Sequence, residues 1–430
     1  MNIYYLIYVF ISSTLILFLA PFILFVSLLT GRYKQLVFER FGFYRFKLPP
    51  THKKRIWLHA VSVGEVNVAR SVIEKLYETD STIEIILSTT TPKGYDFAQT
   101  LEFPDLHCIY SPIDFIGSIR LAFHLVQPHI LVLLETEIWP NWIVTAKLLN
   151  IPVVVVNGRI SQKTVTAYQK FSALSHFIVQ KIDAFSMISV QDAHRICQIG
   201  ANPENVHISG NAKFDILQNS CNHLLPSHLK KKLSIHSDHF VFIAGSTRTG
   251  EEKIILSVFT KLHQKFPDAI CIIAPRHIER CSSIENLIMQ SNLTYNLYSR
   301  CKKFYNRDAN VILVDTIGDL AGLYSIGSVV FCGGSLVPQG GQNVLEPAVW
   351  AKPVLYGPYM DDFLWAKTIL ESSSAGIEVK NEQELLDKVL LFACNQEKAL
   401  QIGQKAKNAV LKESGASEKH VNIIFKSIQI

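Results

Sequence analysis

The sequence lacks the cysteine spacings of disulfide-stapled and zinc-binding proteins. Its 430 residues include eight cysteines, with no Cys-x-x-Cys pair and no histidine at zinc-ligand spacing. We therefore expect reduced thiols in a cytosolic body and no structural metal. The sequence also lacks a Walker loop, an Asp-x-Asp motif, low-complexity tracts and repeats of roughly 20 to 50 residues. These absences exclude P-loop, solenoid and propeller proteins.

Charge is scarce and unevenly placed. Charged residues make up 18% of the chain against 48% hydrophobic residues, which excludes a disordered protein. The net charge is +6, but residues 32–55 alone carry +7, so the rest of the chain carries −1. Such a basic segment after an apolar one favours contact with anionic membrane lipids over nucleic acid; a solvated basic loop is the alternative. Its basic residues are Arg32, Lys34, Arg40, Arg45, Lys47, Lys53, Lys54 and Arg55.

Residues 3–29 contain no charged side chain and predict a membrane anchor. A helix of that length spans a ~30 Å hydrocarbon layer even when it is tilted. A cleaved signal peptide would have a basic start and a shorter apolar region, so we expect the anchor to be retained. The basic residues that follow place the body in the cytoplasm by the positive-inside rule. A hairpin or monotopic insertion broken at Pro21 is the alternative.

The rest of the sequence alternates short apolar runs with amphipathic stretches of helical length. Because strands of a parallel sheet are buried on both faces, such runs predict an α/β protein. We predict an anchor at 1–31, a doubly wound domain at 32–213, a linker at 214–239 and a second doubly wound domain at 240–430 that ends in two or three helices. The predicted strands are 55–60, 84–88, 107–110, 130–134, 153–157, 185–190, 206–209, 240–244, 269–274, 311–314, 329–332 and 354–356.

Polar residues follow the predicted strands of the first domain. In doubly wound sheets ligands bind beyond the carboxyl ends of the strands, and a second domain makes that crevice an interdomain cleft. Ser62, Gly64 and Glu65 lie on the turn after the first strand. Glu65 has the chemistry of a general base if its surroundings raise its pKa; alternatively it only favours the first turn of its helix.

Two more acids and a cation follow later strands of this domain. Glu135 and Glu137 come after the fourth strand, close to Trp139 and Trp142, which suit a sugar or acyl group. The alternative is one capping acid and one solvated acid. Arg159 follows the fifth strand and offers a cation to the same crevice, although an arginine there is otherwise a common surface residue.

In the second domain, glycines and arginines follow the strands. The segment 244–252, with Gly245, Ser246 and Arg248, predicts a loop whose backbone N–H groups bind phosphate. Arg276, between Pro275 and His277, suits a phosphate or carboxylate. Segments 315–319 and 332–348 follow later strands, and the second allows close approach of a nucleotide, with Asn343 and Glu346 in the first helical turns.

These residues resemble the motifs of one family, the Kdo (3-deoxy-D-manno-octulosonic acid) transferases of lipopolysaccharide biosynthesis, which are inverting glycosyltransferases of the GT-B type. The similarity covers nearly the whole chain after the anchor. Two positions depart from the pattern, because Gln342 stands where histidine is expected and Gly158 where alanine is usual. The matching segments are 59–65, 135–141, 157–161, 245–248, 275–277, 316–320 and 340–348.

The resemblance implies an enzyme of the bacterial inner membrane that moves Kdo from CMP-Kdo to the lipid A precursor (lipid IVA). It implies that Glu65 is the general base, and that Glu137 and Arg159, with Ser62 and Gly64, support the acceptor or the sugar. No metal and no further cofactor are required. The residues that would hold CMP are Pro275, Arg276, His277, Ile317, Gly318, Asp319, Asn343 and Glu346.

Two other functions stay open from the residues themselves. One is another membrane-associated GT-B transferase that uses a UDP-sugar and a lipid acceptor. The other is a catalytically idle membrane scaffold that keeps the fold. A scaffold would lack acids at the strand ends, whereas Glu65, Glu135, Glu137 and Glu346 are all present.

Overall fold

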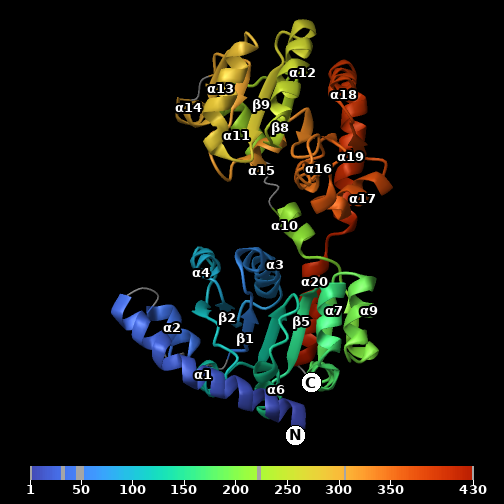
Figure 1. The fold of residues 1–430 in the computed structure, drawn as a ribbon. Helices are drawn as coiled ribbons and strands as arrows, with labels where there is room; N and C mark the ends of the chain where they lie inside the picture. The colour runs from blue at the N-terminus through green and yellow to red at the C-terminus, as the bar shows by residue number, and fades with distance from the viewer. Residues whose placement is uncertain (1, 31–33, 45–52, 220–223, 305–306, 429–430) are drawn as a thin grey trace. The chain divides into compact units, whose positions relative to one another are not determined.

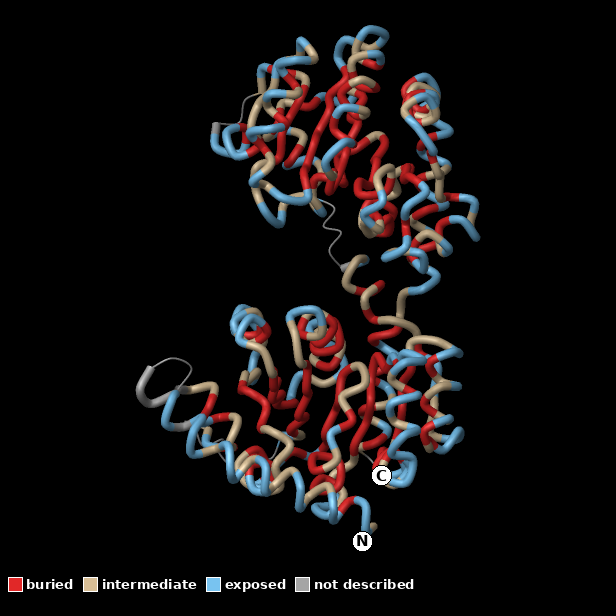
Figure 2. Tube along the Cα trace, viewed as in Figure 1, coloured by how far each residue is buried: buried red, intermediate tan, exposed pale blue. Residues whose placement is uncertain are grey.

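The computed structural model describes residues 2–30, 34–44, 53–219, 224–304 and 307–428. The chain forms two compact units. The first contains residues 1–216 and 414–430, and the second contains residues 217–413. Each unit is built around its own parallel sheet, with the buried residues concentrated in the strands (Figures 1 and 2).

The first unit contains a seven-stranded sheet in the order β3-β2-β1-β4-β5-β6-β7. All its strand pairs are parallel, and the order reverses between β1 and β4. Ligands of open α/β sheets bind where the order reverses, beyond the carboxyl ends of those two strands. The strands are β1 (Arg55–His59), β2 (Glu84–Thr89), β3 (Leu106–Tyr110), β4 (Ile130–Leu134), β5 (Val153–Gly158), β6 (Ala184–Met187) and β7 (Val206–Ile208).

Helices cover both faces of this sheet and bury its apolar side chains. On one face Trp57 and Leu131 pack with Trp142 of α6 and Phe123 of α5. On the other face the strands pack against α3, α4 and α20. The helices of the unit are α1 (Ile3–Thr30), α2 (Lys34–Arg40), α3 (Val63–Thr79), α4 (Pro92–Gln99), α5 (Ile116–Val126), α6 (Pro140–Leu148), α7 (Gln162–Gln169), α8 (Ser172–Val179), α9 (Val190–Gln198), η1 (Pro203–Asn205), α10 (Lys213–Asn219), which continues into the second unit, and α20 (Ala416–Ile428).

The second unit repeats this plan with a parallel sheet in the order β10-β11-β9-β8-β12-β13-β14, which reverses between β8 and β12. Its strands are β8 (Val241–Thr247), β9 (Ile270–Pro275), β10 (Tyr295–Leu297), β11 (Val311–Leu313), β12 (Val329–Cys332), β13 (Val354–Tyr356) and β14 (Gly376–Glu378). Its helices are α11 (Leu225–Lys232), α12 (Glu251–Lys265), η2 (Ile278–Arg280), α13 (Cys281–Gln290), α14 (Tyr298–Phe304), α15 (Leu320–Leu323), η3 (Tyr324–Ile326), α16 (Leu345–Ala348), η4 (Asp361–Phe363), α17 (Leu364–Ser372), α18 (Glu382–Cys394) and α19 (Gln396–Lys412).

The predicted fold class is confirmed, because both units are doubly wound α/β domains and a long apolar helix precedes them. Each of the twelve predicted strands is present. Four strands end earlier than predicted: β1, β7 and β11 by one residue and β6 by three. β6 ends at Met187, because Ser189 caps α9 by accepting a hydrogen bond from the backbone N–H of Asp192. Two strands were missed, β10 and β14, which are three-residue strands at the sheet edges with half-buried side chains.

The predicted domain limits need one correction at the C-terminus. Helix α20 was predicted in the second domain, but it packs on the first unit. Asp215 accepts hydrogen bonds from the N–H groups of Gly415 and Ser417, and His420 is bonded to Ser186 of β6. The predicted linker also differs, because residues 214–239 include α10 and α11, and the division between the units falls after residue 216.

Not all basic residues of the segment 32–55 are available for the predicted contact with anionic lipids. Arg55 is buried and donates to Glu84 at 2.8 Å, so it is a core residue and not a lipid contact. Lys53 pairs with Asp105 at 2.6 Å. Arg32, Arg45 and Lys47 lie outside the described residues.

Candidate active site

Glu65 lies in the first turn of α3, directly beyond the carboxyl end of β1. Its carboxylate folds back on the turn before it: one oxygen accepts from the N–H of Val61 at 2.8 Å and the other from the Ser62 hydroxyl at 3.1 Å. The side chain is half-buried, and Gly64 beside it is exposed. Glu65 is thus held in one place at the point where the strand order reverses, as a base that accepts a proton must be.

Burial raises the pKa of Glu65 to about 7. The hydrogen bond from Val61 opposes this shift in the pKa, the nearby carboxylates of Glu135 and Glu137 raise the pKa further, and the bond from Ser62 lowers it. A carboxyl group with a pKa near neutrality is a much stronger base than an ordinary glutamate. The structure therefore brings Glu65, Glu135 and Glu137 into one electrostatic cluster.

This pKa predicts the pH dependence of any reaction in which Glu65 is the general base. Because a base acts as the carboxylate, we expect kcat/KM to rise with pH through an apparent pKa near 7, and to fall about tenfold per unit below it. Replacing Ser62 by alanine removes a bond that stabilises the charged form, so the acidic limb should move to higher pH. The shift is measured from initial rates of the wild type and S62A at intervals of about one pH unit, from about pH 5 to about pH 9. If the acidic limb of the S62A profile stays at the wild-type pH, Glu65 is not the group that titrates.

Glu135 and Glu137 follow β4 but have different partners. Glu135 lies within 4.0 Å of Arg159 and 3.7 Å of Lys213, so two cations balance its charge. Glu137 accepts a hydrogen bond from the Trp139 indole at 2.8 Å, and burial raises its pKa. Glu135 is therefore the ion-paired acid, whereas the second oxygen of Glu137 has no hydrogen-bond donor among the described residues.

The loop after β5 completes this side of the site. Arg159 is exposed, and its backbone oxygen accepts from the Thr136 hydroxyl, which ties the loops after β4 and β5 together. Asn157, at the end of β5, accepts from the N–H of Ala212 at 2.9 Å and so draws the chain before α10 to the same edge. Lys213 enters the site by this route. Sequence reasoning missed Lys213 because it follows β7, the strand at the far edge of the sheet.

Three of the strand ends carry a backbone strain. Glu135, Asn157 and Ser246 have φ values of 55°, 52° and 54°, in the left-handed region that favours glycine. Each such residue costs on the order of 1 kcal/mol, a strain that proteins concentrate at functional sites. They follow β4, end β5 and lie near the end of β8, so both units carry this strain at the carboxyl edge of the sheet.

The predicted phosphate loop of the second unit is mostly strand. Gly245 and Ser246 belong to β8, where Gly245 pairs with both β9 and β12 and Ser246 lies at an irregularity in the pairing with β9. Gly245 is required there by packing, because a Cβ would lie 2.1 Å from the Tyr324 hydroxyl. The N–H of Arg248 is bonded to Glu251 at 2.8 Å. The prediction of free N–H groups in this loop was therefore wrong at Arg248.

Glu251 organises the glycine segment after β12. One oxygen accepts from the N–H groups of Ser335 and Leu336, both at 3.0 Å, and the other from those of Gly334 at 2.7 Å and Arg248 at 2.8 Å. Its side chain is fully buried. Sequence reasoning missed this role. The only local signal was that Glu251 is an acid in the first turn of a helix, directly after Gly250.

Two guanidinium groups lie at the ends of β8 and β9. Arg248 contacts the ring of His277 at 2.9 Å, and its Nε is buried without a hydrogen-bond partner among the described residues. Arg276 is exposed directly after Pro275, and its charge lowers the pKa of Glu346 while burial raises it. The structure thus brings Arg248, Arg276, His277 and Glu346 to one edge of the second sheet.

The remaining predicted residues of this unit lie along the same edge. Ile317 is 83% exposed, and Gly318, with φ of 91°, has nothing within 4 Å of the place that a Cβ would occupy, so this loop is open to a ligand. Asp319 is bonded to Thr316 and to Lys302. Asn343 lies 3.5 Å from Glu346, and its own oxygen accepts from the N–H of Leu345 at 3.1 Å.

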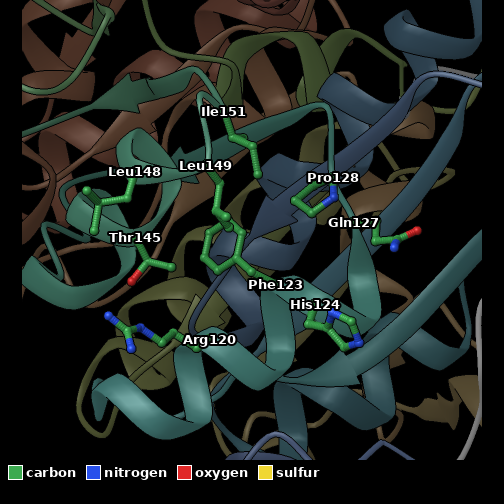
Figure 3. Close-up of a pocket in the computed structure, with 9 residues that line it drawn as sticks. All are labelled: Arg120, Phe123, His124, Gln127, Pro128, Thr145, Leu148, Leu149 and Ile151. Atoms are coloured by element: carbon green, nitrogen blue, oxygen red, sulfur yellow. The ribbon is translucent and has the colours of Figure 1, made fainter.

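The first unit also contains a pocket that none of the predicted site residues lines. It has a volume of about 740 Å³, and Figure 3 shows its lining side chains. Gln127 and Pro128 precede β4, and Leu149 and Ile151 precede β5, so the pocket opens at the amino ends of the strands. Since ligands of such sheets bind at the opposite edge, we assign no catalytic role to it.

Comparison with known proteins gives a consistent result. A family profile described as "3-Deoxy-D-manno-octulosonic-acid transferase (kdotransferase)" matches residues 35–216. The chain is 40% identical over 335 residues to a bifunctional glycosyltransferase/methyltransferase of Fusobacterium nucleatum, covering 77% of this chain but only 51% of that protein. It is 30% identical over 424 residues to the 3-deoxy-D-manno-octulosonic acid transferase of Haemophilus influenzae, covering 96% of this chain and 97% of the relative.

A solved structure agrees on the fold. The chain aligns with a glycosyltransferase from Rickettsia africae at a TM-score of 0.55 and 15% identity, covering 88% of this chain and 99% of the other. That similarity supports the GT-B arrangement of two Rossmann-like domains and nothing finer. The similarity to the Haemophilus influenzae protein extends over almost the full length of both chains. The chain therefore belongs to the Kdo transferase family of glycosyltransferases.

Proposed function

We propose that this protein transfers Kdo from CMP-Kdo to the lipid A precursor (lipid IVA) in lipopolysaccharide core biosynthesis. Family membership supports the sugar and its donor. The observation that carries the chemistry is Glu65, a half-buried carboxylate with a pKa near 7, fixed beyond the end of β1. The proposal assigns the acceptor to the first unit and the donor nucleotide to the second.

On the acceptor side, Glu65 removes the proton from a sugar hydroxyl of the lipid. The oxygen then attacks the anomeric carbon of Kdo from the face opposite the CMP group, which leaves with the bonding electron pair. One displacement inverts the configuration at that carbon. Glu137, with one oxygen held by Trp139, and Arg159 position the acceptor or the incoming sugar.

On the donor side, arginine side chains bind the phosphate, a role that the sequence analysis gave to backbone N–H groups of the segment 244–252. Glu251 already binds the N–H groups of Arg248, Gly334, Ser335 and Leu336. The exposed Arg276 and the guanidinium of Arg248, whose Nε has no partner among the described residues, are the groups suited to the phosphate of CMP. Glu346 and Asn343 are suited to ribose hydroxyls, while Pro275, His277, Ile317, Gly318 and Asp319 complete the CMP site.

We further propose that α1 anchors the enzyme as a monotopic helix at the cytoplasmic face of the inner membrane. Most of the exposed side chains in its described part are apolar, with Phe10 at 72%, Phe18 at 82% and Phe22 at 67% exposure. Tyr5, near its start, donates to Asn141 at 3.0 Å. The next helix, α2, contacts the same unit through Glu39, which accepts from the N–H of Tyr110. A helix crossing the bilayer would place its two ends on opposite sides.

This arrangement predicts the location of the N-terminus. An epitope tag placed before Met1 should be removed by protease added to inverted inner-membrane vesicles, because both ends of α1 then lie on the cytoplasmic side. A tag after Ile430 serves as the control and should be removed as well. Protection of the N-terminal tag alone, with the vesicles intact, would show that α1 spans the membrane.

The function itself is tested by mass analysis of the products. Purified full-length protein, incubated with CMP-Kdo and lipid IVA, should release CMP and yield a lipid heavier by one or more Kdo units. A parallel incubation with UDP-sugars tests the other GT-B reaction, because its products would be UDP and a different added mass. Turnover of a UDP-sugar without turnover of CMP-Kdo would overturn the proposal.

A further inference from the structure

A small pocket of the first unit lies beside the Glu65 turn and contains none of the residues assigned above to the acceptor. Its volume is about 170 Å³, below the ~300 Å³ of sites that hold a whole drug-sized ligand. It has room for a single functional group. We call it the Arg40 pocket, and its walls include Arg40, His59, Thr90, Ser111, Asp114 and Trp139.

The pocket belongs to the carboxyl edge of the first sheet. His59 ends β1, Thr90 follows β2, Ser111 follows β3 and Trp139 follows β4, so neighbouring strands supply four of its walls. The N–H of Thr90 donates to the oxygen of Val61 at 3.2 Å, and the N–H of Val61 donates to Glu65 at 2.8 Å. One backbone hydrogen bond and one bond to the Glu65 carboxylate therefore connect the pocket to the candidate base.

Arg40 supplies a cation without an acidic partner. Its Nε is buried and has no hydrogen-bond partner, and no carboxylate of the described residues lies within ion-pair distance of its guanidinium. The backbone oxygen of Arg40 accepts from the N–H of Ile113 at 2.8 Å, which fixes the end of α2 at the pocket wall. Arg40 as a whole is only partly buried, but a partly desolvated cation without an ion-pair partner still carries a cost, which a bound anion would offset. Burial also lowers the pKa of Arg40.

The two acids near Arg40 are already bound by other groups. Glu39 accepts from the Gln35 side chain and from the N–H of Tyr110. Asp114 lines the pocket, but its oxygens accept from the Tyr8 hydroxyl at 2.6 Å and from the N–H groups of Asn141 and Trp142 at 3.3 Å and 3.2 Å. Both carboxylates therefore have neutral donors as partners, and neither forms an ion pair with the guanidinium.

The uncharged walls offer further donors. Burial lowers the pKa of His59 to about 4, so its ring is neutral at working pH and adds no charge. The hydroxyls of Thr90 and Ser111 lie 3.0 Å apart, and one donates to the other. The hydroxyl that accepts keeps its own proton free for a bound oxygen. A guanidinium and a hydroxyl donor facing one small space suit a phosphate group.

We propose that the Arg40 pocket binds a phosphate group of the lipid acceptor and thereby positions the acceptor hydroxyl at Glu65. The proposal rests on the function proposed above. The acceptor is favoured over the donor because the pocket is also connected to the anchor: Asp114 on its wall is bonded to Tyr8 of α1. A lipid held at the membrane by its acyl chains would reach this pocket with its polar head.

The test compares acceptors with and without phosphate on full-length variants. With the phosphorylated lipid, Arg40→Gln should raise the KM for the acceptor about 10- to 100-fold, the loss of one or two charge-assisted bonds, with the KM for CMP-Kdo unchanged. Arg40→Lys should recover part of this loss. With a phosphatase-treated lipid, the wild type and Arg40→Gln should have the same KM. Arg70→Gln, an exposed arginine of α3 paired with Glu74, is the matched control and should change neither constant.

Two further measurements distinguish phosphate binding from a failure to fold or to transfer Kdo. Binding of each variant to vesicles that contain either lipid, without donor, requires no Kdo transfer, so it tests the pocket even if the proposed reaction is wrong. Ser111→Ala, a milder change, should weaken binding of the phosphorylated lipid only, in case Arg40→Gln does not fold. Equal losses with both lipids, or a rise confined to the KM for CMP-Kdo, would overturn the proposal.

Discussion

Replacing Glu65 by glutamine is expected to lower kcat by about 10²- to 10⁴-fold, because the site loses the general base that we propose. The fold should survive, since a glutamine oxygen can still accept from the N–H of Val61 and its amide can donate to the Ser62 hydroxyl. Transfer of Kdo to lipid IVA, measured at saturating concentrations of both substrates, gives the effect. Burial keeps the pKa of Glu65 near 7, so the residual rate of E65Q should also lose the acidic limb of the pH profile.

The control for this change lies on the same helix. Glu78 of α3 is 61% exposed and pairs only with Lys75 three residues earlier, so E78Q should keep the wild-type rate. Circular dichroism and the thermal midpoint of both variants show whether the fold is intact. Full activity of a folded E65Q protein would exclude Glu65 as the base and would leave Glu137 as the remaining unpaired acid of the cluster.

Replacing Glu251 by glutamine is expected to destabilise the segment 334–336 severely. A carboxylate accepts four backbone N–H groups here, whereas glutamine offers one oxygen and turns an NH₂ group toward the donors that face its second position. Each buried N–H group that is left without an acceptor costs about 1–3 kcal/mol. Hydrogen exchange of peptides covering residues 333–342 should become faster, and the affinity for CMP should fall with it.

A second glutamate of the same unit provides the comparison. Glu279 is exposed in η2, and E279Q should leave both the exchange of residues 333–342 and the binding of CMP unchanged. Unchanged protection of the Gly334, Ser335 and Leu336 amides in E251Q would show that Glu251 does not hold this segment. Weak CMP binding with normal protection would instead assign Glu251 to the nucleotide directly, which its full burial argues against.

Much of the fold could be predicted because parallel strands leave a local signal. A strand buried on both faces must be apolar along its whole length, as in 153–156, and each such run was found. The edge strands β10 and β14 were missed because three half-buried residues leave no such run. Glu65, Glu137 and Arg276 could be selected because polar residues that directly follow a buried strand have few structural reasons to be there.

The glycine segments show the limit of this reasoning. Glycines beside a strand end suggested a phosphate loop. In the structure, Gly245 makes room for the Tyr324 side chain, and the N–H groups after β12 donate to Glu251. Glu251 and Gly334 lie 83 residues apart, so no local pattern connects them. The same holds for Lys213, which reaches Glu135 only because Asn157 draws the preceding chain to the site edge.

The sequence by itself determined the two parallel α/β units, the apolar N-terminal helix and the strand ends that carry the acids and arginines. These follow from periodicity and from residues that are neighbours in the chain. Only the tertiary structure decided that α20 returns to the first unit, that Arg55 is a core residue, that Glu251 binds the loop amides and that Arg40 faces a pocket. Each of these depends on partners far away in the chain, whose hydrogen-bonding groups become neighbours only after the sheet has formed.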